Sequence, residues 1–475
     1  MTVEMQGPPP PADPWAPPPA TGETKAPRRR RRRLLTIVVA AVLVVALGAA
    51  GLVYVLVGRS GGHSYPAHWD ARIAPIAHEV EKLRHLSFEH AVPVDFLPDA
   101  KFRKLVTADD KDLSAADRRD VQRSEGLLRA LGLIGRDVDL LHESNRLQGS
   151  DVLAFYDQDA KRIRIRGENL TVDTRVTLAH ELTHALQDQH FDLTKLDRDA
   201  RHDNDQTALT ALVEGDAERV EHAYVDQLSS ADRRAYENAQ DSQTSSIKDD
   251  TGDVPGILVA VQQAPYTLGE TMVATIKALH GAGGVDDAFR DPPRTELDVL
   301  APILGDDLGS ARHVATPVAV AGERREGKPD VFGAVGLYLT LASRIPAVDA
   351  LHVADGWAGD SMIEVRRGDA WCVRAAFRGR DTAATAAIAD GLRRWAATMP
   401  GGMATVGVKD DTVTLASCDR GTPVPTAKDF ADDALTVATV RDGLAAGIVQ
   451  SGVPGDLAQC VADGVVARQD LYTVV

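Results

Sequence analysis

One pentapeptide, His-Glu-Leu-Thr-His, carries the clearest chemistry in the sequence and runs from His180 to His184. Side chains four positions apart on an α-helix lie ~40° apart around the axis, so both imidazoles face one side and can bind one metal ion. Glu181 lies beside the first imidazole, where a carboxylate can take a proton from water that zinc has made acidic. The same short pattern also occurs by chance on ordinary helices. We predict one zinc ion per chain, with Glu181 as general base.

A catalytic zinc site needs a third protein ligand, and the sequence offers two. Glu214 lies on a helix expected over residues 207 to 228, where Gly215 allows a neighbouring backbone to approach closely. His190 follows the second histidine by six residues, and a continuing helix carries it ~240° around the axis from that ligand. We therefore expect Glu214 to complete the site and keep His190 as the alternative. If Glu214 binds no metal, it belongs to a solvated acidic face.

Three more side chains are candidates for supporting roles. Glu218 lies one helical turn after Glu214 and can accept a ring N–H from a ligand histidine. Asp188, one turn past His184, can do the same or simply place a charge at the helix end. Tyr266 is a candidate donor to the negative oxygen that forms when a peptide carbonyl is attacked, with ordinary core packing as the alternative.

These motifs resemble a known group of enzymes. A His-Glu-x-x-His pentapeptide followed by a glutamate on the next helix is similar to the gluzincins, thermolysin among them. A family of bacterial and archaeal peptidase-like proteins, secreted or membrane-attached, resembles the chain in six segments between residues 75 and 420: FYDQDAKRIRIRG, HELTHALQDQHFDL, ALVEGDA, APYTLGETMV, AFRDPPRTELDVLAP and GWAGD. The resemblance implies a zincin-like fold, His180, His184 and Glu214 as zinc ligands, Glu181 as base, and a peptide or protein substrate.

The sequence departs from these families at two places. The spacing between His184 and Glu214 is longer than in thermolysin, and we expect an inserted loop at Leu193 to Asp205. His190 falls at the position of the third ligand in metzincins, but Gln187 replaces the glycine that lets their chain leave the helix. A metzincin-type peptidase using His190 is therefore the alternative within the same enzyme class.

A β-hairpin is expected directly before the zinc helix, which we predict over Asp173 to Gln189. Its strands are the alternating runs Val152 to Tyr156 and Arg162 to Arg166. In zincin-like folds the strand before the metal helix borders the cleft, so the resemblance implies that an extended substrate pairs with the second run. Three arginines lie on one side of that run: Arg162, Arg164 and Arg166. They either favour an acidic substrate or are solvated.

Hydrophobic periodicity predicts an α+β chain. We expect a mostly helical zincin-like metallopeptidase domain with a small edge sheet at 71–350, a small α+β unit at 351–420 and a helical segment at 421–475. Further helices are expected at 71–86, 114–131, 272–280, 332–342 and 382–397, and further strands at 91–97, 362–366, 371–377, 404–408 and 412–416.

The N-terminal residues predict how the chain meets a membrane. A proline-rich tract and six consecutive arginines fill residues 1–33, followed by 24 uncharged residues at 34–57 and a spacer at 58–70. At ~1.5 Å per residue such a run crosses a ~30 Å hydrocarbon core. The arginines favour a cytoplasmic N-terminus and an extracellular catalytic domain, on a single-pass cell-membrane protein. A cleaved signal peptide is the alternative.

The net charge limits the classes of molecule that the protein can bind. The net charge is −16, and since residues 1–33 carry seven Lys/Arg and three Asp/Glu, the rest sums to −20. An acidic body has no basic face for phosphates, which argues against nucleic acid as a partner.

Outside the cell a disulfide is possible, and we predict one between Cys372 and Cys418, which begin one predicted strand and follow the end of another, leaving Cys460 free.

A non-catalytic binding role is the alternative to an enzyme. A non-catalytic cell-envelope interaction protein could keep a zincin fold, with its proline-rich tail binding a cytoplasmic partner. Such a scaffold has no need for the general base Glu181 beside intact ligands. We therefore predict a membrane-anchored zinc-dependent endopeptidase, one that hydrolyses peptide bonds outside the cytoplasmic membrane.

Overall fold

The computed structural model describes residues 64–108, 113–200, 203–251, 254–419, 421 and 430–468. The tail predicted at 1–33 and the transmembrane helix predicted at 34–57 lie outside the described residues. Within the described ranges no helix combines the length and the apolar character that a membrane span requires.

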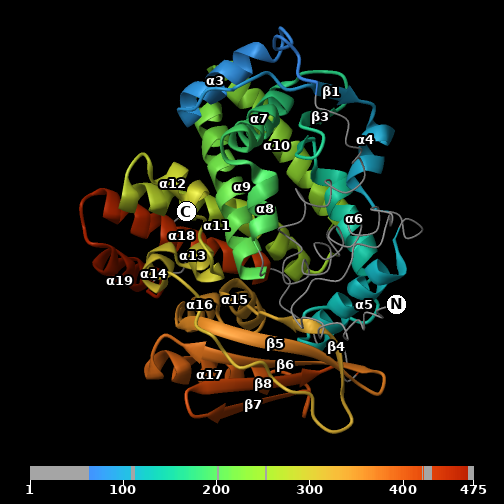
Figure 1. Ribbon diagram of the computed structural model, residues 1–475, viewed down its shortest axis with the longest axis vertical. Helices are drawn as coiled ribbons and strands as arrows, with labels where there is room; N and C mark the ends of the chain where they lie inside the picture. The colour runs from blue at the N-terminus through green and yellow to red at the C-terminus, as the bar shows by residue number, and fades with distance from the viewer. Residues whose placement is uncertain are drawn as a thin grey trace, which may run out of the picture.

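The described residues form an α+β structure that is mostly helical and has two sheets (Figure 1). The helices before the five-stranded sheet are α3 (Ala74–Arg84), α4 (Asp99–Val106), α5 (Ala115–Ala130), α6 (Leu140–Asp151), α7 (Val172–Phe191), α8 (Leu193–Asp199), α9 (Asp203–Asp226), α10 (Ser230–Thr251), α11 (Gly256–His280), α12 (Gly284–Arg290), α13 (Glu296–Leu300) and α14 (Pro302–Leu308). Those that follow or interrupt that sheet are α15 (Ala334–Ala342), α16 (Ala347–Asp355), α17 (Thr382–Ala397), α18 (Phe430–Gln450) and α19 (Gly455–Val466).

The smaller sheet contains the predicted hairpin. Its order is β1-β3-β2, with β1 (Val94–Leu97) parallel to β3 (Arg162–Arg166), and β2 (Ala154–Asp157) antiparallel to β3. The hairpin is confirmed, but the expectation that β3 borders a cleft is wrong, because β1 and β2 occupy both of its sides. The parallel partner comes from far earlier in the chain, so the local pattern could not reveal it.

The three arginines of β3 are paired with carboxylates of this chain. Arg162 donates to Asp95 at 2.9 Å, Arg164 to Asp157 at 3.1 Å and Arg166 to Asp99 at 2.6 Å. Their guanidinium groups already have acidic partners. They therefore give no support to the idea that β3 selects an acidic substrate.

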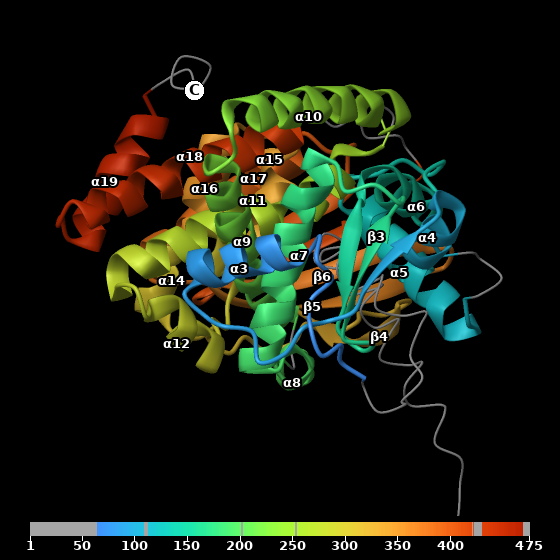
Figure 2. The ribbon, with the colours of Figure 1, turned by 90° about the horizontal axis from the view of Figure 1, so that it is seen from above.

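Helix α7 carries the pentapeptide and continues past Gln187, as predicted. Thr171 caps its start by accepting a hydrogen bond from the Thr174 amide, and it ends at Asp192, whose φ of 53° breaks the helical path. The helix packs against α3, α9 and β2, and Figure 2 shows α3 crossing beside α7 and α9. Instead of an inserted loop, the segment after α7 forms the short helix α8, and α9 begins at Asp203.

Helices α9 and α11 approach each other through two glycines. A Cβ on Gly215 would lie 2.1 Å from the carbonyl carbon and oxygen of Gly269, and one on Gly269 would lie 2.3 Å from the Ala211 oxygen. Neither helix could carry a side chain at this crossing. The close approach predicted for Gly215 is confirmed, and it brings α11, with Tyr266 on it, against the helix that carries Glu214.

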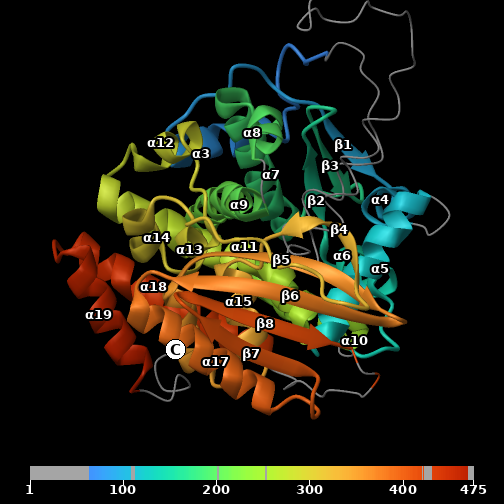
Figure 3. The same cartoon turned by 60° about the horizontal axis from the view of Figure 1, so that its bottom comes forward.

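The larger sheet has the order β4-β5-β6-β8-β7 and is antiparallel throughout (Figure 3). Its strands are β4 (Arg324–Asp330), β5 (Trp357–Arg367), β6 (Ala370–Gly379), β7 (Ala404–Lys409) and β8 (Thr412–Cys418). Cys372 of β6 is directly opposite Cys418 of β8 and forms the predicted disulfide with it, while Cys460 is free and exposed. Strand β4 joins this sheet from before residue 350, so the sheet extends across the boundary predicted there.

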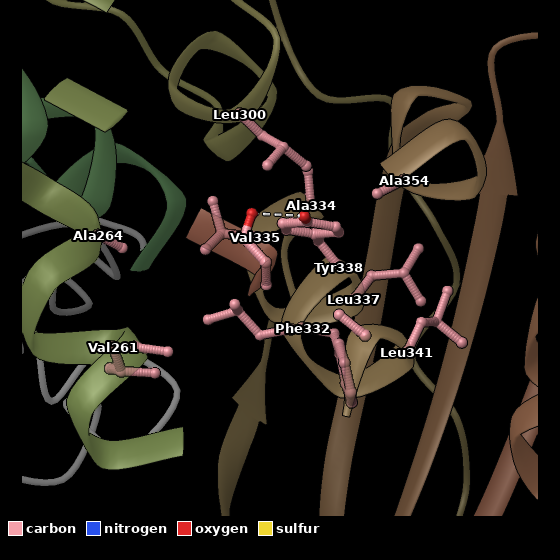
Figure 4. Close-up of a cluster of buried hydrophobic side chains, with 14 of the residues drawn as sticks. Val261, Ala264, Leu300, Phe332, Ala334, Val335, Leu337, Tyr338, Leu341 and Ala354 are labelled. Carbon is pink, nitrogen blue, oxygen red and sulfur yellow. Dashed lines mark hydrogen bonds between the residues drawn. The ribbon is translucent and has the colours of Figure 1, made fainter. Parts of the chain in front are cut away.

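One continuous core joins the helices to the larger sheet. Buried apolar side chains of α5, α9, α11, α13, α15, α16, α17 and α18 form one cluster with those of β5, β6 and β8. Figure 4 shows part of this cluster around α15, with labelled residues from α11, the end of α13, the segment just before α15 and α15 itself: Val261, Ala264, Leu300, Phe332, Leu337, Tyr338 and Leu341. The Tyr338 hydroxyl donates to the Ala434 carbonyl at 2.6 Å, which ties α15 to α18. This core fixes α9 and α11, whereas α7 packs with α3 and the smaller sheet in a second cluster of buried apolar side chains.

Candidate metal centre

Three of the predicted residues converge at one point between α7 and α9. Glu214 Oε2 lies 3.2 Å from His180 Nε2 and 3.3 Å from His184 Nε2. The two imidazole rings are 4.7 Å apart between centroids and nearly perpendicular, at 82°. All three side chains are buried. Among the described residues, this trio is one of two groups of histidines and carboxylates whose atoms lie close enough together to hold a metal ion.

Two of the three ligand-to-ligand distances match those around a tetrahedral metal ion such as zinc. Ligand atoms ~2.0–2.1 Å from a tetrahedral zinc are separated by ~3.3 Å, and the two nitrogen-to-oxygen distances are 3.2 and 3.3 Å. Imidazole nitrogen with one carboxylate is a donor set common in catalytic zinc sites. The residues therefore fit the predicted ion.

The charge around this point also suits a divalent cation. Burial alone would raise the pKa of Glu214, but the two imidazoles hold it at about 2. Burial would lower the pKa of His180, yet Glu214 and Glu221 raise it well above its usual value. The lowered pKa keeps Glu214 ionised, and the raised pKa of His180 shows that the nearby carboxylates favour positive charge at this point. A metal dication could supply that charge in place of a proton.

Glu181 is buried beside the two histidines. Its Oε2 accepts a hydrogen bond from the backbone amide of Tyr156 on β2, at 2.7 Å. Burial raises the pKa of Glu181, although the neighbouring imidazoles oppose the rise. One carboxylate oxygen is thus held by β2, and the other can accept a proton.

The outer nitrogen of His180 faces two carboxylates of α9. Its Nδ1 lies 3.1 Å from Glu221 Oε2 and 3.7 Å from Glu218 Oε1. Glu221 is therefore the nearer carboxylate, within ion-pair distance although no hydrogen bond joins the two, and Glu218, predicted for this role, lies farther away. The sequence did carry a signal for Glu221, because residues seven apart, such as Glu214 and Glu221, lie on the same face of a helix.

The outer nitrogen of His184 has a neutral partner, Gln187, which the sequence marks only as the residue in place of the metzincin glycine. His184 Nδ1 lies 3.1 Å from the Oε1 atom of Gln187 on the same helix. Gln187 is fully buried. The two histidines thus have different surroundings on the side away from Glu214.

The two remaining candidates on α7 point away from the metal ligands. Asp188 accepts hydrogen bonds from the Tyr156 hydroxyl at 2.7 Å, from Lys161 at 2.6 Å and from the Leu193 amide at 3.1 Å. These contacts tie β2 and α8 to α7 and give Asp188 a structural role. His190 is exposed and lies 2.8 Å from the Ser87 carbonyl oxygen, through its Nε2 atom.

Tyr266 lies at the site from the side of α11. Its ring centroid is 6.2 Å from that of His180. Burial, reinforced by Glu214, Glu181 and their acidic neighbours, raises the pKa of Tyr266 well above its usual value. The phenol therefore keeps its proton and remains a hydrogen-bond donor.

Comparison of the chain with protein-family models, curated proteins and solved structures found no match.

Proposed function

We propose that this protein is a membrane-anchored, zinc-dependent endopeptidase with a zincin-like fold of the gluzincin type. The observation that carries the proposal is the convergence of His180 Nε2, His184 Nε2 and Glu214 Oε2, with Glu181 buried beside them. The anchor is inferred from the sequence at 34–57 and the ion from the donor set.

The side chains at the site have separate roles in peptide hydrolysis. Zinc, when bound, supplies a Lewis acid that polarises a peptide carbonyl and makes water acidic enough to lose a proton near neutral pH. Glu181 takes that proton as the water oxygen bonds to the carbonyl carbon, and returns it to the amine nitrogen as the C–N bond breaks. Tyr266, which stays protonated, donates a hydrogen bond to the negative carbonyl oxygen.

Strand β2, not β3, is the strand that an extended substrate would join. The Arg166 amide donates to the Leu153 carbonyl at 2.8 Å, whereas the Tyr156 amide donates to Glu181 at 2.7 Å. Because backbone groups alternate along an antiparallel strand, those of Ala154 and Tyr156 point away from β3. A peptide pairing with this side of β2 would lie beside Glu181.

Digestion of a peptide library by the purified full-length chain tests the proposal. We expect cleavage by the zinc-loaded wild type, loss of cleavage with a chelator and recovery on adding zinc. The Glu181→Gln chain should bind zinc but cut ~10²- to 10⁴-fold more slowly, because the amide keeps the shape and removes the base. If the zinc-loaded wild type cuts no peptide, or the glutamine variant is equally active, the enzyme assignment fails.

A further inference from the structure

Gln187 is held so firmly that its side-chain amide can adopt one orientation only. Its Nε2 atom donates to the Val213 carbonyl at 3.0 Å and to Asp216 Oδ2 at 3.0 Å. Both partners are acceptors, so the nitrogen must face them. The oxygen of the amide then faces His184 Nδ1 at 3.1 Å, on the opposite side.

This orientation fixes which nitrogen of His184 carries the proton. An amide oxygen can only accept a hydrogen bond, so Nδ1 of His184 must be the donor. In a neutral imidazole the other nitrogen then carries the free electron pair. That nitrogen, Nε2, is the atom that lies 3.3 Å from Glu214 Oε2.

Asp216, which holds the amide, is itself held from two sides. Arg84 of α3 donates to its Oδ2 at 2.6 Å and Arg219 to its Oδ1 at 3.0 Å. Arg84 also donates to Asp286 of α12 at 2.6 Å, and Asp216 is fully buried. Side chains of α3, α7 and α9 therefore all donate to the Asp216 carboxylate. If the Gln187 amide rotated, this buried carboxylate would lose one of its hydrogen bonds.

We propose that Gln187, supported by Asp216 and Arg84, is a positioning residue that holds His184 as the Nδ1–H tautomer and directs its Nε2 electron pair at the metal. The inference deepens the proposed function and rests on it for the identity of the ion. It also distinguishes the two histidines, since the Nδ1 atom of His180 faces carboxylates instead. Groups that orient a metal-binding histidine typically change metal affinity 10- to 100-fold when removed.

Zinc affinity of Gln187→Met against Gln189→Met, both as metal-stripped full-length chains, tests this role. Gln189 is two residues along the same helix and holds another segment, accepting from the Glu89 amide at 2.7 Å and donating to the His90 carbonyl at 3.0 Å. We expect ~10- to 100-fold weaker zinc binding for Gln187→Met and wild-type affinity for the control. Unchanged affinity of a folded Gln187→Met chain would overturn the proposal, since a purely structural residue alters unfolding alone.

A measurement on the wild type keeps the test decisive if the variant does not fold. Nitrogen NMR of the metal-free, ¹⁵N-histidine-labelled chain, recorded at a pH high enough that His184 is neutral, reports the tautomer of this histidine. We expect the Nδ1–H form, and the Nε2–H form would refute the inference. If the proposed function itself is wrong, the result is different: the wild type will bind no zinc, or cut no peptide, whichever tautomer His184 adopts.

Discussion

Substituting Gly215 by alanine tests whether the close crossing of α9 and α11 maintains the site. The new Cβ would lie 2.1 Å from the Gly269 backbone, and real Cβ contacts essentially never fall under 3.0 Å, so the helices must separate by about 0.9 Å. Overpacking of this kind costs ~1–3 kcal/mol. Alanine recovers up to ~1 kcal/mol through its better helix propensity. We expect the metal-free protein to lose up to ~2 kcal/mol of unfolding free energy.

The same displacement should reach the metal ligands, because Glu214 is the adjacent residue. Binding constellations tolerate errors of ~0.5 Å, less than the separation required here. We therefore expect the Gly215→Ala chain to bind zinc at least ~10-fold more weakly.

Gly447 provides the matched control. It lies within helix α18, and a Cβ there would meet nothing within 4 Å. Gly447→Ala should therefore stabilise the protein by up to ~1 kcal/mol and leave zinc affinity unchanged. Urea unfolding of both metal-free chains, followed by zinc titration, makes the comparison. A Gly215→Ala chain that is as stable as Gly447→Ala and binds zinc like the wild type would refute the packing argument.

Three other predictions concern the neighbours of the ligands and the cysteines. Glu221→Gln should weaken zinc binding more than Glu218→Gln, because Glu221 is 3.1 Å and Glu218 3.7 Å from His180 Nδ1; calorimetric titration giving the opposite order would contradict this. Tyr266→Phe should keep zinc and lower kcat ~10²- to 10³-fold with little effect on KM, and an unchanged kcat would exclude it as the oxyanion donor. Cys460 should react with a maleimide in the unreduced folded protein, whereas the Cys372–Cys418 pair should react only after reduction; mass spectrometry showing more than one label before reduction would rule this out.

Features governed by local sequence were predictable. The pentapeptide forms its helix face because the spacing of His180 and His184 is a property of any α-helix. The helix predicted at 114–131 is present as α5, and Ser114 caps its start with Asp117 completing a capping box. The pairing of Cys372 with Cys418 is less local, since 46 residues separate them, but it followed from their positions at the start of one predicted strand and just after the end of another.

Features governed by distant partners were not predictable from one sequence. Strand β3 pairs with β1, more than 60 residues earlier, and this pairing moved the free strand edge from β3 to β2. The role of Gln187 depends on Asp216, which belongs to another helix. Helix α10 was missed because its residues are largely polar and show little of the apolar periodicity that reveals a helix.

Zinc binding by Glu214→Ala compared with His190→Ala tests the central claim most directly. Glu214 converges with both histidines of the pentapeptide, whereas His190 is exposed and contacts the Ser87 carbonyl. We predict one zinc ion per wild-type chain, a large loss of affinity in the Glu214→Ala chain and wild-type affinity in the His190→Ala chain. Retention of zinc by Glu214→Ala, or its loss from His190→Ala, would contradict the proposed ligand set.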